Sequence, residues 1–218
     1  MAQTTFANKY RDLVGQEVRT VGEAFEEFTE ILGSPVNALY KSMVSDIVGT
    51  THLITVNARF KRDAIWSLGM VSALDLLFKN YPEAGTGAKI CSALFQATGL
   101  DEDAIRAEAA SISSWAEGKS KDEISAALRG EGDSPVAKIA SAAKADEFWM
   151  YSRFFGLGLV KMMEMVGIEQ NADETYPVME EWMGKALDKP FFTACVSFCD
   201  ARRDTLNRIV HYFISAWY

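Results

Sequence analysis

The sequence predicts an all-α protein, a single irregular helical bundle of about eight to ten helices, two of them central and apolar. Three observations lead to this fold class. Apolar residues recur at helical spacing from Val36 to Val48, signals for helix starts occur repeatedly, and β-branched residues never alternate with polar ones over a strand's length. The 218 residues are 49% hydrophobic and 24% charged, which is ordinary for a globular protein and sufficient for one large core.

Helix starts are marked by side chains that cap a first turn. Thr20 and Ser120 each stand three positions before a Glu, the spacing of a capping box. Ser34 and Ser134 each precede a proline, which suits the first turn of a helix. In chain order, these signals and the apolar periodicity predict helices near residues 21–32, 35–53, 61–80, 87–98, 102–117, 121–130, 135–145, 146–167, 175–187 and 190–216.

Two segments within these helices, residues 64–78 and 148–166, are apolar on nearly every side. A helix of this kind belongs in the middle of a bundle, with amphipathic helices around it. Gly69, Gly156 and Gly158 lie within these segments, where a glycine costs about 1 kcal/mol relative to alanine. We therefore expect another helix to approach closely at these glycines.

Charged residues interrupt both apolar helices. Asp75 lies in the first and Arg153 in the second, and an unpaired charge would be too costly to bury. Both are therefore expected to be buried with a hydrogen-bonding partner, and pairing with each other is one arrangement that this leaves open. Asn37 and Asn57 are expected to be further buried polar residues with a structural role.

The composition divides the chain into an extension and one helical domain. Residues 1–19 are expected to be a flexible N-terminal extension, and residues 20–218 the helical domain. Within the domain, the segment near 118–145 is rich in Gly, Ser, Ala and charge, so we expect weak packing there. The first sixteen residues contain no apolar core of a signal peptide, and three charges interrupt the apolar run 148–168. Neither a signal peptide nor a transmembrane segment is therefore expected.

The composition also excludes several classes of function. A formal net charge of −8 repels polyanions, so nucleic-acid binding is not expected. Two histidines and three cysteines are too few for a disulfide framework or a zinc site, although Cys195, Cys199 and His211 would be the first residues to consider as zinc ligands. The usual dinucleotide, phosphate-loop, hydrolase and zinc-protease motifs are absent. We therefore predict no catalytic residue, no cofactor and no metal, and read the thiols as typical of a reducing compartment.

The C-terminal end is the best candidate for an interaction surface. Phe213, Trp217 and Tyr218 lie at the end of the sequence, where chain termini fray unless something covers them. We take these three aromatic residues as candidate partner-binding residues. Docking onto the protein's own bundle, or contact with a membrane interface, are the alternatives.

Residues 34–83 resemble the signature block of the thylakoid formation proteins. The matching residues are Pro35, Asn37, Tyr40, His52, Leu53, Val56, Asn57, Phe60, Asp63, Leu68, Gly69, Val71, Asp75, Phe78, Tyr81, Pro82 and Glu83. The similarity continues at residues 90–97 and 151–155. The order and spacing of these motifs over most of residues 20–167 make the resemblance specific. The chain departs from the family at its C-terminus, which is aromatic and apolar where the family usually has a long, charged helix.

The resemblance implies a non-enzymatic, all-α protein bound peripherally to thylakoid membranes, in the plastid stroma or on the cytoplasmic side of a cyanobacterial thylakoid. Its implied role is photosystem II biogenesis and repair and thylakoid organisation, through an FtsH-type protease, with no established cofactor. A structural subunit of a photosystem or light-harvesting antenna supercomplex is the alternative, which the altered C-terminus favours. A small-molecule enzyme or pigment-binding bundle has only the buried polar residues to support it.

Overall fold

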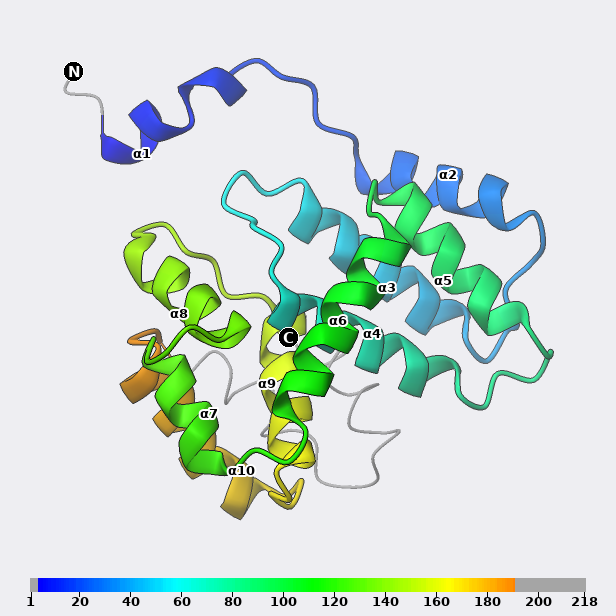
Figure 1. Ribbon diagram of the computed structural model, residues 1–218. Coiled ribbons are helices and arrows are strands. Elements are labelled where there is room, and N and C mark those ends of the chain that lie inside the picture. The colour runs from blue at the N-terminus through cyan, green and yellow to red at the C-terminus, as the bar shows by residue number, and fades with distance from the viewer. Residues whose placement is uncertain (1–3, 191–218) are drawn as a thin grey trace.

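The computed structural model describes residues 4–190, and every regular element in that range is helical (Figure 1). The elements are α1 (Thr5–Lys9), the 3₁₀-helix η1 (Arg11–Leu13), α2 (Val21–Leu32), α3 (Lys41–Thr55), α4 (Ala64–Phe78), α5 (Thr86–Ala97), α6 (Glu102–Ala116), α7 (Lys121–Leu128), α8 (Pro135–Ala145), α9 (Arg153–Met165), α10 (Ala172–Met179) and the π-helix η2 (Glu180–Ala186). The predicted all-α fold is confirmed. The helix predicted over 190–216 lies, apart from its first residue, outside the described residues.

The bundle is organised around the crossing of α4 and α9. α4 packs most extensively on α9 and α6, and also touches α5 and α8. At the crossing, a Cβ atom added to Gly69 would lie 1.8 Å from the carbonyl oxygen of Phe154, and one added to Gly158 would lie 2.0 Å from that of Ile65. Only glycine permits backbones to approach so closely, so the predicted close contact is confirmed at Gly69 and Gly158.

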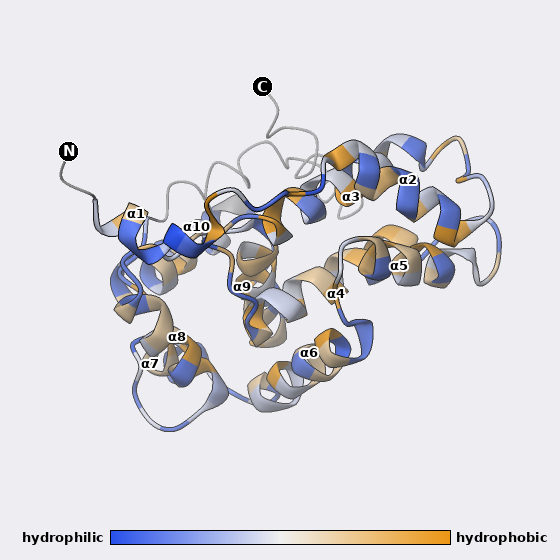
Figure 2. Cartoon of the chain, turned by 90° about the horizontal axis from the view of Figure 1, so that it is seen from above, coloured by the Kyte–Doolittle hydropathy of each residue, from blue (hydrophilic) through white to orange (hydrophobic). Residues whose placement is uncertain are grey.

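Two apolar cores lie on either side of this crossing. The first is formed mainly by α2 to α5 and contains Phe28, Trp66 and Phe95. The second joins α6 to α10 and η2, and contains Phe155 and Trp182. α4 contributes to both cores, and Figure 1 shows α2, α3 and α5 to the right of α9 and α7, α8 and α10 to its left. Around the outer helices α6, α7 and α8, hydrophilic and hydrophobic residues alternate, as expected for amphipathic helices (Figure 2).

Three of the four predicted capping sites are confirmed. Thr20 and Ser120 each form the predicted capping box at the start of α2 and α7. Ser134 accepts a hydrogen bond from the backbone of Ala137 at the start of α8. The prediction at Ser34 is wrong, because α3 begins only at Lys41 and the residues between them form turns.

The α9 helix also begins later than predicted, at Arg153 instead of residue 146. The intervening loop is held by Arg59, which donates from Nε to the carbonyl oxygen of Phe148 (3.0 Å) and from Nη2 to that of Trp149 (3.1 Å). Ser152 then caps α9 by accepting a hydrogen bond from a backbone N–H in its first turn. The hydrogen bonds from Arg59 thus hold residues 148 and 149 in a loop, where the sequence predicted the first turns of the helix.

The polar segment near 118–145 forms the short helices α7 and α8, which pack on each other and, through α7, on η2. Of its few large apolar residues, Ile124, Leu128 and Val136 are fully buried in the second core, and Ile139 is partly buried against it. Most of its other buried residues are alanines, so the segment packs closely with little apolar area per residue.

Candidate protein-binding surface

Two loops at one end of the bundle are held together by a set of polar and aromatic contacts that we name the clasp: Asn37, Tyr40, Asn80, Tyr81 and Glu83. The backbone N–H of Asn37 donates to Tyr81 Oη (2.8 Å), and its side-chain Nδ2 donates to Glu83 Oε1 (3.1 Å). The Tyr40 hydroxyl donates to the carbonyl oxygen of Asn80 (3.0 Å), and the rings of Tyr40 and Tyr81 lie 4.6 Å apart. The clasp therefore fixes the turn before α3 against the loop between α4 and α5.

The clasp holds one apolar side chain in solvent. Leu39 is 81% exposed, and its backbone N–H donates to Asn37 Oδ1 (3.0 Å). A single exposed leucine is common on protein surfaces. This one differs because its backbone is held by an asparagine that itself makes two further hydrogen bonds. The turn presents Leu39 in a fixed position.

A second surface is the N-terminal arm, residues 4–20, which crosses from the side of α8 to α2 in Figure 1. At its start, the Phe6 ring packs edge-on against Phe148 with centroids 5.3 Å apart. Lys9 Nζ donates to Asp146 Oδ1 (2.8 Å), while Lys61 Nζ donates to the other carboxylate oxygen (2.7 Å). The hydrogen bonds from Lys61 and Lys9 hold the pKa of the Asp146 carboxyl far below its usual range.

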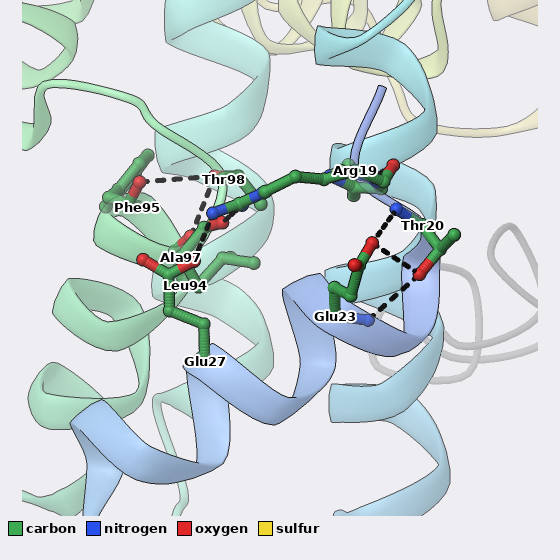
Figure 3. A network of polar contacts seen from close by, with 9 residues as sticks. Arg19, Thr20, Glu23, Glu27, Leu94, Phe95, Ala97 and Thr98 are labelled. Atoms are coloured by element: carbon green, nitrogen blue, oxygen red, sulfur yellow. Dashed lines mark hydrogen bonds and ion pairs between the residues drawn. The ribbon is translucent and has the colours of Figure 1, made fainter. Parts of the chain in front are cut away.

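The other end of the arm is attached through Arg19 (Figure 3). The Arg19 guanidinium donates to the Glu27 carboxylate and to the carbonyl oxygen of Ala97, which joins the arm to α2 and to the end of α5. The carbonyl oxygen of Arg19 lies 2.7 Å from His52 Nε2. A carbonyl oxygen can only accept, so His52 carries a proton on Nε2 and donates it.

Beside this attachment lies an exposed apolar strip, which we define as Val18, Val21, Leu53 and Val56. Their exposed fractions are 58%, 38%, 48% and 37%. Val21 lies over α3, since a Cβ atom added to Gly49 would meet its Cγ1 at 3.4 Å. Leu53 on α3 and Val56, the C-cap residue after it, follow Gly49 at helical spacing and lie on the same face.

Comparison with known proteins places the chain in a family. The sequence profile described as thylakoid formation protein matches residues 20–194. The chain belongs to this family. It is 27% identical over 178 residues to Protein Thf1 of Crocosphaera subtropica, covering 79% of this chain and 74% of that protein.

A plant relative and a solved structure extend the comparison. Protein THYLAKOID FORMATION 1, chloroplastic, of Arabidopsis thaliana is 26% identical over 154 residues, which cover 70% of this chain and 51% of that protein. The chain thus spans about half the length of this plant relative. The structure of Psb29 determined at 1.55 Å superposes with a TM-score of 0.71 at 20% identity, over 87% of this chain and 98% of the other, so the two share a fold.

Residues of the thylakoid formation motifs that are distant in sequence meet in the clasp. Asn37 and Tyr40 come from the opening motif of the signature block, and Tyr81 and Glu83 from its closing motif. Asn37 is half-buried, not buried as predicted, and it makes three hydrogen bonds. The sequence pattern located these residues, but did not indicate that Leu39 would be exposed between them.

Two other residues of the family motifs are not buried as predicted. Asp75 is 64% exposed, and its closest ion pair is with Arg106 on α6 (3.7 Å), so the prediction that it is buried is wrong. Arg153 is half-buried, and its charge acts on Asp46 of α3. Burial raises the pKa of the Asp46 carboxyl, and Arg153 opposes this shift.

The prediction that Asn57 is buried is also wrong. Asn57 is exposed just after α3, where its Oδ1 accepts a hydrogen bond from the backbone N–H of Arg59 (2.9 Å). Asn commonly ties a turn to its own backbone in this way, without needing burial. Asp146 and Arg59, which hold the loop before α9, were missed because their partners lie 85 to 137 residues away.

Most of the residues considered as metal ligands or as partner-binding residues lie outside residues 4–190. Within that range there is no group of three side chains that could hold a metal ion. Cys91 is buried, and burial raises the pKa of its thiol to about 12. Among the described helices, none combines the length and the hydropathy needed to cross a bilayer. The predicted residues that lie outside the described part of the chain are Cys195, Cys199, His211, Phe213, Trp217 and Tyr218.

Proposed function

We propose that this thylakoid formation protein is a non-enzymatic protein-binding factor at the thylakoid membrane. Its task is in photosystem II biogenesis and repair and in thylakoid organisation, and its partner is a membrane-bound FtsH-type protease. Membership of the family supports the thylakoid setting, as do the cyanobacterial relatives named Thf1 and the chloroplastic relative from Arabidopsis thaliana. The protein acts from the membrane periphery, in the stroma or on the cytoplasmic side.

The clasp is the observation that supports protein binding. Most of the binding energy of an interface comes from a few buried side chains that fill pockets on the partner. Leu39 is suited to such a role because it is 81% exposed before binding, and burying a leucine side chain stabilises a complex by about 2 kcal/mol. The hydrogen bonds of Asn37 order its backbone in advance, which lowers the entropy lost on association.

Affinity capture from solubilised thylakoids tests the proposal. We would compare the tagged full-length protein with Leu39→Asp, and use Val14→Asp as a matched control, because Val14 is 83% exposed but lies on the N-terminal arm. Leu39→Asp should retrieve at least about tenfold less of the partner, and Val14→Asp the same amount as the unmodified protein. Both variants should keep their melting temperature, because neither side chain is part of a core.

The proteins that are captured distinguish the two functions considered. An FtsH-type protease that depends on Leu39 supports the proposal. A photosystem core or antenna complex recovered in equal amounts with the protein would instead indicate a structural subunit. Equal capture by the unmodified protein and Leu39→Asp would show that the clasp is not the contact.

A further inference from the structure

The exposed apolar strip lies where the N-terminal arm meets the C-terminal end of α3. Arg19, the neighbour of Val18, is hydrogen-bonded through its carbonyl oxygen to His52, the neighbour of Leu53. Val21 contacts α3 one turn before Leu53. The arm and the end of α3 therefore place their exposed apolar side chains near one another, and grouped apolar residues on a surface commonly mark a binding site.

We propose that residues 191–218 of the same chain cover this strip. This segment has an apolar content that matches the surface, with Ile209, Val210, Phe213, Ile214 and Trp217 near its end. Of the three roles considered for Phe213, Trp217 and Tyr218, the proposal selects docking on the protein's own bundle. It does not depend on the proposed binding of a partner at the clasp, which lies at the other end of α3.

The segment starts close enough to reach the strip. Lys189 donates to the carbonyl oxygen of Asp146 (3.3 Å), and Lys61 donates to the carboxylate of the same residue (2.7 Å). The Cα atoms of the two lysines therefore lie within about 25 Å of each other, and at most about 18 Å of chain separates Lys61 from Val56. A segment of 28 residues spans about 42 Å as one helix and about 90 Å when extended, which is enough for this path.

The formal charges of the strip's surroundings and of residues 191–218 favour this segment over an anionic membrane as the partner of the strip. The segment contains three arginines and two aspartates and no lysine or glutamate, so its formal charge is +1, while the whole chain carries −8. The strip lies beside Glu17 and the helix α2, whose sequence contains four glutamates and no basic residue, and Arg19 offsets only one of these, Glu27. This acidic surrounding attracts the segment and repels anionic lipid head groups.

Limited digestion of the full-length protein with trypsin tests the proposal. Cleavage after Arg202 or Arg203 requires that the segment leave the surface, and the products are identified by intact mass. Leu53→Asp places a charge in the strip, so it should speed this cleavage about tenfold. Leu39→Asp is the matched control, because it introduces the same charge at an exposed leucine in the clasp and should leave the rate unchanged. Equal rates for the unmodified protein and Leu53→Asp would overturn the proposal.

A cross-linking measurement tests the same proposal without placing a charge at Leu53, which could destabilise the protein by itself. Leu53→Cys, treated with a short bismaleimide, should join to Cys195 or Cys199 within one molecule, while Cys91 is buried and does not react. Lys89→Cys at the far end of α5 is the control, and should give little of this product. The proposal fails if Leu53→Cys gives only products between two molecules that increase with protein concentration, or if Cys195 and Cys199 react freely and no cross-link forms.

Discussion

Asp63 caps a helix with its carboxylate in a buried position that disfavours the charged form of that group. Its Oδ1 accepts a hydrogen bond from the backbone N–H of Trp66 (2.9 Å) and so caps α4. Burial raises the pKa of the same carboxyl to about 6, and the nearby charge of Glu108 adds to this shift, although the hydrogen bonds from Trp66 and Ile65 oppose it. The residue therefore gives the protein a pH dependence opposite to that of an ordinary paired carboxylate.

The sign of this dependence can be tested with Asp63→Asn. In the unfolded chain Asp63 titrates near 3.9, so between pH 4 and 6 the folded protein holds the proton more tightly. The group therefore adds stability as the pH falls from 7 to 4, and loses this contribution as the pH rises through 6, by at most about 3 kcal/mol. Asn keeps the cap but does not titrate. Urea unfolding should show Asp63→Asn gaining stability relative to the unmodified protein from pH 4.5 to 7, and parallel curves would contradict the assignment.

At the residue scale, local contacts were predictable and distant ones were not. Thr20, Ser120 and Ser134 cap their helices through backbone groups three positions away, so the sequence pattern contains the whole interaction. Ser34 has the same pattern, but the next turn is tied to the α4–α5 loop through the clasp. Asp75 was misplaced because α4 is apolar on nearly every side, so its periodicity does not indicate which side faces solvent.

At the scale of elements, the α4–α9 crossing depends on two glycines, and Gly69→Ala tests this. The new methyl group would overlap the carbonyl oxygen of Phe154 and the backbone nitrogen of Gly158, 2.5 Å away, and neither can move without shifting a helix. We expect a loss of about 3 kcal/mol or more in the free energy of unfolding, measured by urea denaturation.

Gly22→Ala is the control for this prediction. Gly22 also lies in a helix, but a Cβ atom there would meet only Thr20 Oγ1 at an ordinary 3.7 Å. The protein should then become about 0.5 kcal/mol more stable, because alanine favours the helix more than glycine does. If Gly69→Ala left the free energy of unfolding unchanged, the close crossing would not exist in solution.

The existence of most elements followed from the sequence, while two boundaries did not. Apolar periodicity and capping signals located α2 and α4 to α8 because each helix contains its own signal. The late starts of α3 and α9 result from contacts with residues far away in the chain, namely the clasp and Arg59. α1 and η1 carry too few residues for periodicity to identify them.

At the scale of the whole molecule, Asp146 joins four parts of the chain that the sequence does not place together. Its carboxylate accepts hydrogen bonds from Lys9 on the arm and Lys61 before α4, and its carbonyl oxygen accepts one from Lys189 after η2. The backbone N–H of Phe148 completes the set (3.1 Å). The Asp146 side chain is only 7% exposed, whereas those of Lys9 and Lys61 are 37% and 66% exposed.

Asp146→Ala should therefore lower the stability of the whole protein and loosen the N-terminal arm. Loss of charged hydrogen bonds at a buried carboxylate should lower the free energy of unfolding by about 2 kcal/mol and the melting temperature by about 5 °C. Trypsin should also cleave after Lys9 more rapidly, because α1 loses its ion pair. Asp133→Ala is the control, since its pair with Lys138 is exposed on both sides (91% and 66%) and should contribute little.

The pH dependence separates this electrostatic role from a simple loss of packing. The lysines hold the pKa of Asp146 below that of the unfolded chain, so its contribution is fully present above about pH 4 and is lost as the pH falls further. This is the reverse of the dependence expected for Asp63. The difference in stability between the unmodified protein and Asp146→Ala should thus be constant from pH 5 to 7 and shrink on acidification below pH 4. A difference that stays constant at every pH would show that Asp146 acts by filling space, and not by joining the charged groups of four segments.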